Sequence, residues 1–295
     1  MAFEIKSRIA TFGGELLKLS HPSSATKTPM AVSIYLPPAS KTARVPVLLF
    51  LSGLTCTPDN CSEKGFLHAS ASKHGIAVVY PDTSPRGAAI AGEDDAYDFG
   101  SGAGFYIDAV REPWSTNYKM ETYVVSELLT ALFASASSPP EVDIAEKLDK
   151  GRVSITGHSM GGHGALTLYL KNPGLFRSVS AFSPIANPSR CPWGEKAFAG
   201  YLGSDDKEEW KRHDATELVR GEGWKGKDLR ALIDVGTGDN FYKQGQLLPE
   251  NFEAAVKEAD VSGVTVRYQE NYDHSYYFIS TFAQDHVEHA AKYLF

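Results

Sequence analysis

Ser159 stands at the centre of Gly157-His158-Ser159-Met160-Gly161, a pattern typical of a serine nucleophile. A strand pattern over 152–156 precedes it and a helical pattern over 165–170 follows it. A sharp strand-to-helix turn exposes the hydroxyl, and it brings the residues two before and two after so close that only small side chains fit. The five residues alone also fit a glycine-rich turn with an idle serine, but the flanking strand and helix favour a nucleophile.

Such a nucleophile requires an acid and then a histidine later in the chain, each on a loop that follows a strand. Asp239 comes just after a buried strand pattern over 229–236, and His274 comes just after a strand pattern over 264–270. The three residues therefore occur in the required order. We predict Ser159 as nucleophile, Asp239 as the acid that orients the imidazole, and His274 as general base.

Other titratable residues fit these roles less well. His158 and His163 lie too close in the chain to reach the Ser159 hydroxyl, and we expect His163 to be a packed helix residue, with a supporting role at the site as the alternative. Asp234 lies inside its strand, and Asp273 adjoins the predicted base. The remaining histidines lack a strand-end position or fall on the terminal helix at its solvated side or at the edge of the core: His21, His68, His74, His213, His286 and His289.

The oxyanion of an acyl-transfer reaction needs two N–H donors. One is predicted to be the backbone N–H of Met160, the residue after the nucleophile. The other is predicted at Leu54, on the loop that follows a nearly continuous apolar strand over 45–51. Gly53 permits a backbone turn that aims the Leu54 N–H inward, although an ordinary strand exit fits the composition equally well.

Three bulky or reactive side chains are candidates for the acyl pocket. Cys56 lies two residues beyond Leu54, and we expect it near the active site, with a buried inert cysteine as the alternative. Met160 and Trp193 are candidates to close a small pocket by steric exclusion. Trp193 fits equally a role as core anchor.

Composition limits the function classes. The chain has 295 residues, 42% hydrophobic and 22% charged, which favours a single domain over 1–295 with a large core. The formal charge of −7 and the lack of a basic cluster argue against nucleic acid, and no apolar run has the length of a membrane span. Three cysteines and an N-terminus without a signal-peptide core are typical of a cytoplasmic protein with reduced thiols. We expect no metal site, because Cys56 and Cys61 are too few and wrongly spaced for zinc.

Alternating strand and helix patterns predict an α/β fold. A long segment over 83–117, rich in glycine and aromatic residues, is expected to be a functional loop rather than a disordered one. The segment between the strands at 178–183 and 229–236 has room for a few short helices over the site, but not for a full lid domain. The other predicted elements are strands near 12–21, 31–36 and 76–80 and helices near 66–74, 120–135 and 249–260.

The stretches that carry these motifs resemble the S-formylglutathione hydrolase (esterase D) family. The resemblance spans nearly the whole chain and is strongest at 52–60, 80–87, 97–106, 157–162, 187–203 around Pro192-Trp193-Gly194, and 273–278. It implies an α/β-hydrolase fold, a mostly parallel central sheet flanked by helices without a large cap domain. It also assigns nucleophile, acid and base to Ser159, Asp239 and His274, and the oxyanion donors to Leu54 and Met160.

The same resemblance implies a cytoplasmic enzyme, often a homodimer, that needs no metal or other cofactor. Its substrate would be S-formylglutathione, cleaved to glutathione and formate in formaldehyde detoxification, with side activity on small esters. A general small-ester carboxylesterase or acyltransferase and a non-catalytic ligand-binding protein on the same fold are the alternatives. Four cations are candidates to bind the negatively charged glutathione, although each also fits a solvated surface charge: Lys64, Arg86, Arg111 and Lys196.

Overall fold

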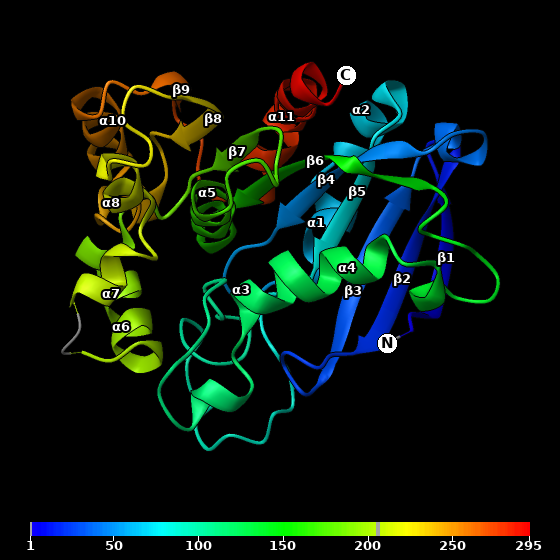
Figure 1. Cartoon of the computed structure of the whole chain (residues 1–295). Coiled ribbons are helices and arrows are strands. Elements are labelled where there is room, and N and C mark those ends of the chain that lie inside the picture. The colour runs from blue at the N-terminus through cyan, green and yellow to red at the C-terminus, as the bar shows by residue number, and fades with distance from the viewer. Residues whose placement is uncertain (1, 205–206) are drawn as a thin grey trace.

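A mixed sheet runs through the whole molecule (Figure 1), as described by a computed structural model of residues 2–204 and 207–295. Within these residues the sheet has nine strands in the order β1-β2-β3-β5-β4-β6-β7-β8-β9. The pairs from β1 to β5 are antiparallel, and all pairs from β5 to β9 are parallel. The strands are β1 (Glu4–Thr11), β2 (Gly14–Pro22), β3 (Pro29–Leu36), β4 (Val45–Leu51), β5 (Ala77–Pro81), β6 (Leu148–His158), β7 (Val179–Phe182), β8 (Asp228–Gly236) and β9 (Ser262–Gln269).

The central strands are apolar because helices cover both faces of the sheet. Every residue of β4, β5 and β7 is buried, as expected of parallel strands packed on both sides. One core lies between the sheet and the helices α3, α4, α5, α6, α8 and α10, and a second lies between the opposite face and α1, α2 and α11 (Figure 1). Helices therefore cover both faces of the sheet, and the loops that follow its parallel strands gather at one of its edges.

The helices are bounded as follows: α1 (Pro58–Lys64), α2 (Leu67–His74), α3 (Met120–Thr122), α4 (Leu129–Leu132), α5 (Met160–Lys171), α6 (Pro192–Tyr201), α7 (Lys207–Lys211), α8 (Ala215–Arg220), α9 (Asn240–Lys243), α10 (Pro249–Glu258) and α11 (Tyr276–Leu294). A π-helical segment (Tyr123–Leu128) joins α3 to α4 into one continuous helix. Short 3₁₀ turns lie at Pro38–Lys41, Trp114–Thr116, Ser135–Ser137 and Pro188–Arg190.

The α/β-hydrolase architecture expected from the sequence is confirmed, and the elements that the sequence patterns missed include β1 and α1. Strand β1 (Glu4–Thr11) has no buried residue, so it lacks the apolar face by which a strand is recognised. Helix α1 (Pro58–Lys64) is too short to show a helical period, and its start is set instead by a capping box between Thr57 and Asn60. No separate cap domain covers the sheet in the residues described, and the predicted short helices of the insert are α6, α7 and α8.

The loops that leave β4, β6, β8 and β9 all follow the carboxyl ends of parallel strands, which meet at one edge of the sheet. The expected long loop over 83–117 is indeed irregular and contributes Tyr97 to a cavity at this edge. Across residues 2–204 and 207–295, no helix combines the length and the apolar character needed to cross a membrane.

Candidate active site

Ser159 occupies a strained turn between β6 and α5. Its backbone has φ +58° and ψ −118°, a region that residues other than glycine rarely adopt. Three backbone hydrogen bonds hold the turn: Ser159 N–H donates to Phe182 O at 2.9 Å, and Ser159 O accepts from His163 and Ile185 at 3.0 and 3.2 Å. The strain is therefore held by neighbouring elements, as predicted for a nucleophile turn.

The two flanking glycines are required by close backbone contacts. A Cβ at Gly157 would lie 2.1 Å from Gly161 O, and a Cβ at Gly161 would lie 2.0 Å from Leu51 O. Any side chain at either position would force the turn apart or push β4 away from it. This agrees with the expectation that only small residues fit two positions before and two after Ser159.

Asp239 and His274 meet although they lie on different loops. The Asp239 side chain is fully buried; its Oδ1 accepts the N–H groups of Phe241 and Tyr242 at 2.7 and 3.4 Å, and its Oδ2 accepts His274 Nδ1–H at 2.5 Å. The loops touch so closely that a Cβ at Gly238 would lie 2.5 Å from Asn271 O. Asp239 thereby fixes the tautomer of His274, leaving Nε2 as the proton acceptor.

Ser159 and His274 border the same cavity, of about 240 Å³. No hydrogen bond joins their side chains in the residues described. In unliganded enzymes this bond is often long and tightens only in the complex with substrate. The structure thus brings together the three residues that the sequence predicted, with Asp239 and His274 already bonded.

The loop after β4 packs directly against the nucleophile. A Cβ at Gly53 would lie 3.1 Å from Ser159 Cβ, so glycine is needed for close approach. The left-handed backbone of this loop lies at Thr55, with φ +68°. Within the described chain neither the Leu54 nor the Met160 N–H donates to a protein acceptor, so both remain available to a ligand.

Comparison with known proteins finds relatives over nearly the whole chain. A family model described as "Putative esterase" matches residues 23–289. S-formylglutathione hydrolase of Rattus norvegicus is 52% identical over 283 residues, which cover 96% of this chain and 95% of the rat protein. The chain belongs to the S-formylglutathione hydrolase family. The enzyme of that name from Paracoccus denitrificans is 47% identical over 294 residues, covering 100% of this chain and 99% of its own.

A solved structure of an S-formylglutathione hydrolase from Agrobacterium tumefaciens superposes with a TM-score of 0.90 at 43% identity, and each chain is covered in full. This agreement confirms the α/β-hydrolase fold of the chain. In the described residues, no group of three or more His, Cys, Asp or Glu side chains is arranged to hold a metal ion.

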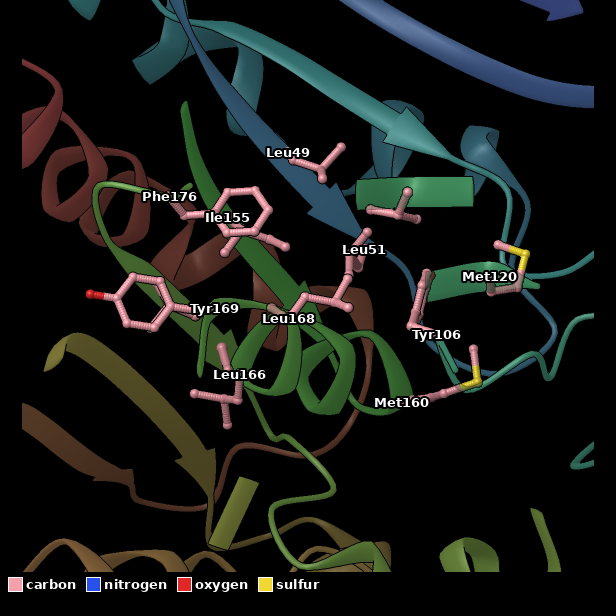
Figure 2. Packing of buried hydrophobic residues seen from close by; sticks show 14 of the residues in the cluster. Leu49, Leu51, Tyr106, Met120, Ile155, Met160, Leu166, Leu168, Tyr169 and Phe176 are labelled. Atoms are coloured by element: carbon pink, nitrogen blue, oxygen red, sulfur yellow. The ribbon is translucent and has the colours of Figure 1, made fainter. Parts of the chain in front are cut away.

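The side chain of Met160 does not close the pocket, contrary to our expectation. It is fully buried and belongs to the core on the α5 face of the sheet (Figure 2), near Tyr106 and Met120. The reason is local: Met160 is the first residue of α5, whose residues from Met160 to Leu170 are all buried. Only the backbone of Met160 is left for the site.

Cys56 and Trp193 both border the cavity, as predicted. Burial raises the pKa of the Cys56 thiol, whose Sγ lies 3.6 Å from Tyr276 Oη. Trp193 packs against Phe241 with a ring separation of 4.6 Å, and its Nε1 donates to Tyr97 Oη at 3.3 Å. Trp193 is therefore both part of the wall and anchored to its neighbours.

Four residues that the sequence analysis did not assign to the site also line this cavity: Thr55, Tyr97, His158 and Phe241. Phe241 and Tyr97 continue the aromatic wall formed by Trp193. His158 is also there: its ring centroid lies 4.4 Å from that of His274, and burial, followed by the nearby His274, holds its pKa well below the usual value. Phe241 was detectable because it follows Asp239 by two residues, but the position of the His158 ring depends on the turn geometry.

The rival acids and bases have other partners. Asp234 accepts hydrogen bonds from Arg267, Gln269 and His286 inside the sheet, and Asp273 accepts from Ser275. The packed role expected for His163 is confirmed, since it is fully buried and its Nε2 bonds to Phe105 O. Two expectations were wrong: His286 is fully buried, and His21 lies within β2 near its end.

The candidate cations for glutathione differ in their surroundings. Lys64 and Arg111 are exposed, and Lys196 pairs with Asp98. Arg86 differs from a free surface charge because it pairs with the buried Asp82, although its side chain is 38% exposed.

Proposed function

We propose that this protein hydrolyses the thioester S-formylglutathione to glutathione and formate, with side activity on small carboxylic esters. The observation that carries the proposal is the assembly of Ser159, Asp239 and His274 around one cavity, in a chain 52% identical to an S-formylglutathione hydrolase. We further propose that residues 1–295 act as one domain, in the cytoplasm and as a homodimer, as the family resemblance implies.

In the first half-reaction Ser159 Oγ attacks the formyl carbon while His274 Nε2 takes the hydroxyl proton. The resulting oxyanion accepts hydrogen bonds from the N–H groups of Leu54 and Met160. When the C–S bond breaks, glutathione leaves as a thiolate and takes the proton from His274. Asp239 holds the imidazole in place and stabilises its charged form throughout.

Water then repeats the attack on the formyl-Ser159 ester. His274 removes a proton from the water, the second oxyanion occupies the same N–H pair, and the C–O bond to Ser159 breaks. Ser159 recovers its proton from His274, and formate leaves. All groups that this cycle requires belong to the chain itself.

The cavity supports the side activity on esters. A formyl group has only two non-hydrogen atoms, whereas the cavity measures about 240 Å³ and has a wall formed by Trp193, Phe241 and Tyr97. The remaining space accommodates the cysteinyl portion of glutathione or the alcohol of an ester. A general carboxylesterase is therefore the second candidate function.

Hydrolysis of S-formylglutathione by the purified protein tests the proposal, measured by the release of thiol and of formate. We expect kcat/KM for this thioester to exceed that for a neutral aryl acetate, and Ser159→Ala to abolish both activities. Equal kcat/KM for the two substrates would favour the general carboxylesterase. Labelling of Ser159 by an organophosphate distinguishes either enzyme from a non-catalytic binding protein.

A further inference from the structure

The loop that carries Leu54 contains a strained turn. Cys56 N–H donates to Gly53 O at 3.3 Å, and Thr55, the third residue of the turn, has φ +68°. A type II turn requires such a φ at this position and normally has glycine there. A β-branched threonine adopts it only when its surroundings enforce it.

The surroundings do so through three hydrogen bonds at the end of the turn. Thr55 N–H donates to Gly102 O at 2.9 Å. The carbonyl of Cys56 accepts two donors from the loop after β5, Thr83 Oγ1 at 2.5 Å and Arg86 Nη2 at 3.0 Å. These contacts lie one and two residues after Leu54, whose N–H is the proposed oxyanion donor.

Arg86 is itself held rigidly by Asp82. Its Nε donates to both carboxylate oxygens of Asp82 at 3.1 and 2.9 Å, and its Nη2 donates to one of them at 2.9 Å. Asp82 is only 4% exposed and also accepts the Thr83 N–H at 2.7 Å. A planar guanidinium fixed in this way supplies a donor of defined direction, which a lysine ammonium cannot reproduce.

We propose that Arg86 is a positioning residue of the oxyanion hole: anchored by Asp82, it holds the Cys56 carbonyl and thereby aims the Leu54 N–H at the oxyanion formed on Ser159. The inference rests on the proposed acyl-transfer function. It gives Arg86 a different role from binding the carboxylates of glutathione, because its Nε and Nη2 are already engaged with Asp82 and Cys56.

The expected kinetic effect follows from when the hydrogen bond to the oxyanion forms. The oxyanion exists only in the tetrahedral states, so a misdirected Leu54 N–H lowers kcat and leaves KM nearly unchanged. Loss of one oxyanion donor costs on the order of 10²–10³ in kcat, and a displaced donor should cost less, about 10- to 100-fold. The loss is the same for a charged and a neutral substrate.

The experiment compares Arg86→Ala and Arg86→Lys with Arg44→Ala, a matched control at an exposed arginine paired with Glu146. Each variant is assayed with S-formylglutathione and with a neutral aryl acetate, after the fraction of active sites has been titrated. The dissociation constant of an alkyl trifluoromethyl ketone, which binds Ser159 as a tetrahedral oxyanion, is measured in parallel. For Arg86→Ala we expect kcat on both substrates and the affinity for the ketone to fall by the same factor, with Arg86→Lys recovering only part and Arg44→Ala unchanged.

Two outcomes would overturn the proposal. A rise in KM for S-formylglutathione with normal turnover of the aryl acetate would make Arg86 a glutathione-binding residue. A smaller active fraction with unchanged ketone affinity per active site would make it a purely structural one.

If Arg86→Ala does not fold, Thr83→Val, which removes the other donor to Cys56 O at nearly constant volume, must give the same parallel loss, and its absence overturns the proposal. A wild-type protein that cleaves only the aryl acetate disproves the proposed thioester substrate, while the Arg86 test proceeds on the ester. A wild-type protein that neither cleaves these substrates nor binds the ketone overturns both proposals.

Discussion

Two aspartate–histidine pairs lie at strand β8, and their chemistry is alike while their surroundings differ. Asp234 accepts His286 Nε2–H at 2.9 Å, and both side chains are fully buried. Asp239 accepts His274 Nδ1–H at 2.5 Å, and the His274 side chain is 15% exposed. The first pair lies inside the sheet, whereas the second lies beyond its edge, against a cavity.

The buried pair has all its charge compensated by protein groups. Arg267 donates to both oxygens of Asp234, at 2.7 and 2.5 Å, and Gln269 donates at 2.8 Å. Burial alone would raise the pKa of Asp234, but the bonds from His286 and Arg267 hold it well below its usual value. The His286 ring lies 3.5 Å from that of Phe182, so no space remains for a substrate.

The pair at the edge is only partly engaged by the protein. Asp239 is satisfied by two backbone N–H groups and by His274, but the far side of His274 faces the cavity that Ser159 borders. We therefore propose that position relative to the strand end separates a structural pair from a catalytic one. The following predictions test that distinction.

The largest effect should follow from removing the charge of the edge pair. Asp239→Asn should lower kcat on the order of 10⁴-fold, because the amide stabilises the wrong tautomer of His274. The measurement is steady-state hydrolysis of S-formylglutathione, with Asp273→Asn as the matched control because that carboxylate adjoins His274 but bonds to Ser275. Near-full activity of Asp239→Asn would require another acid.

Removing the charge of the buried pair should instead affect stability. Asp234→Asn removes the buried carboxylate to which Arg267 and His286 bond, but Arg267 is 33% exposed and keeps its ion pair with Asp285, so a cost of about 1–3 kcal/mol is expected. We expect this loss in the free energy of unfolding from urea titration, with kcat per active site changed by less than an order of magnitude. If Asp234→Asn lost activity while keeping its stability, the distinction between the two pairs would fail.

Buried neutral histidines should make stability depend on pH. Burial lowers the pKa of His163 and of His213 to about 3 and also lowers that of His286. As the pH decreases, each of these histidines is protonated in the unfolded chain before it is protonated in the folded one. The free energy of unfolding is therefore highest above about pH 6.5 and falls below it, by about 1.4 kcal/mol per pH unit for each group. Asp234, with its lowered pKa, adds a further loss below about pH 4.

Urea unfolding at pH 7.5, 6 and 5 measures this dependence. His286→Gln removes one of the titrating groups and should reduce the slope while lowering stability at pH 7.5. A free energy of unfolding that stays constant from pH 7.5 to 5 would contradict buried neutral histidines.

The contrast between the pairs also marks what the sequence alone could predict. Ser159, Asp239 and His274 were predictable because each follows a strand whose pattern is visible in the sequence. The rejection of Asp234 as the acid rested on the same logic. Its partnership with His286 was not predictable, because it depends on how the terminal helix α11 packs across the sheet, and we expected His286 on the solvated side of that helix or at the edge of the core.

The directions in which groups point were harder to predict than which residues belong to the site. Met160 was expected both to donate its N–H and to close the pocket, yet the turn sends its side chain into the core (Figure 2). Arg86 appeared as a surface charge because nothing in the sequence indicates that the loop after β5 returns to the carbonyl of Cys56. Contacts between loops distant in the chain decided both.

The cavity beside the edge pair should set acyl specificity. Wild-type kcat/KM should fall from formyl to acetyl to butyryl along a series of glutathione thioesters, and Trp193→Ala should flatten that slope by removing part of the wall. Contacts of one methylene are worth about 1–3 kcal/mol, so a change of about 10- to 200-fold for the butyryl substrate is expected. Trp224→Ala is the matched control, because Trp224 packs against Tyr169 and does not border the cavity. Equal rates across the wild-type series would contradict a restrictive pocket.

The smallest effect on turnover is expected at Cys56, the one thiol that borders the cavity among the three described cysteines. Burial raises its pKa, so a bulky maleimide should react slowly, and once attached it should block the cavity or displace the loop that carries Leu54. Cys56→Ser should turn over substrate at nearly the wild-type rate and resist the reagent. Cys61→Ser and Cys191→Ser, which alter thiols buried away from the cavity, should remain sensitive.

An inactive Cys56→Ser enzyme would indicate a direct role for the thiol, and a wild-type enzyme unaffected by the maleimide would show that the cavity does not admit it. The maleimide tests whether the cavity beside His274 is accessible. Protection of Cys56 by the trifluoromethyl ketone would therefore show that the maleimide acts beside Ser159 and His274.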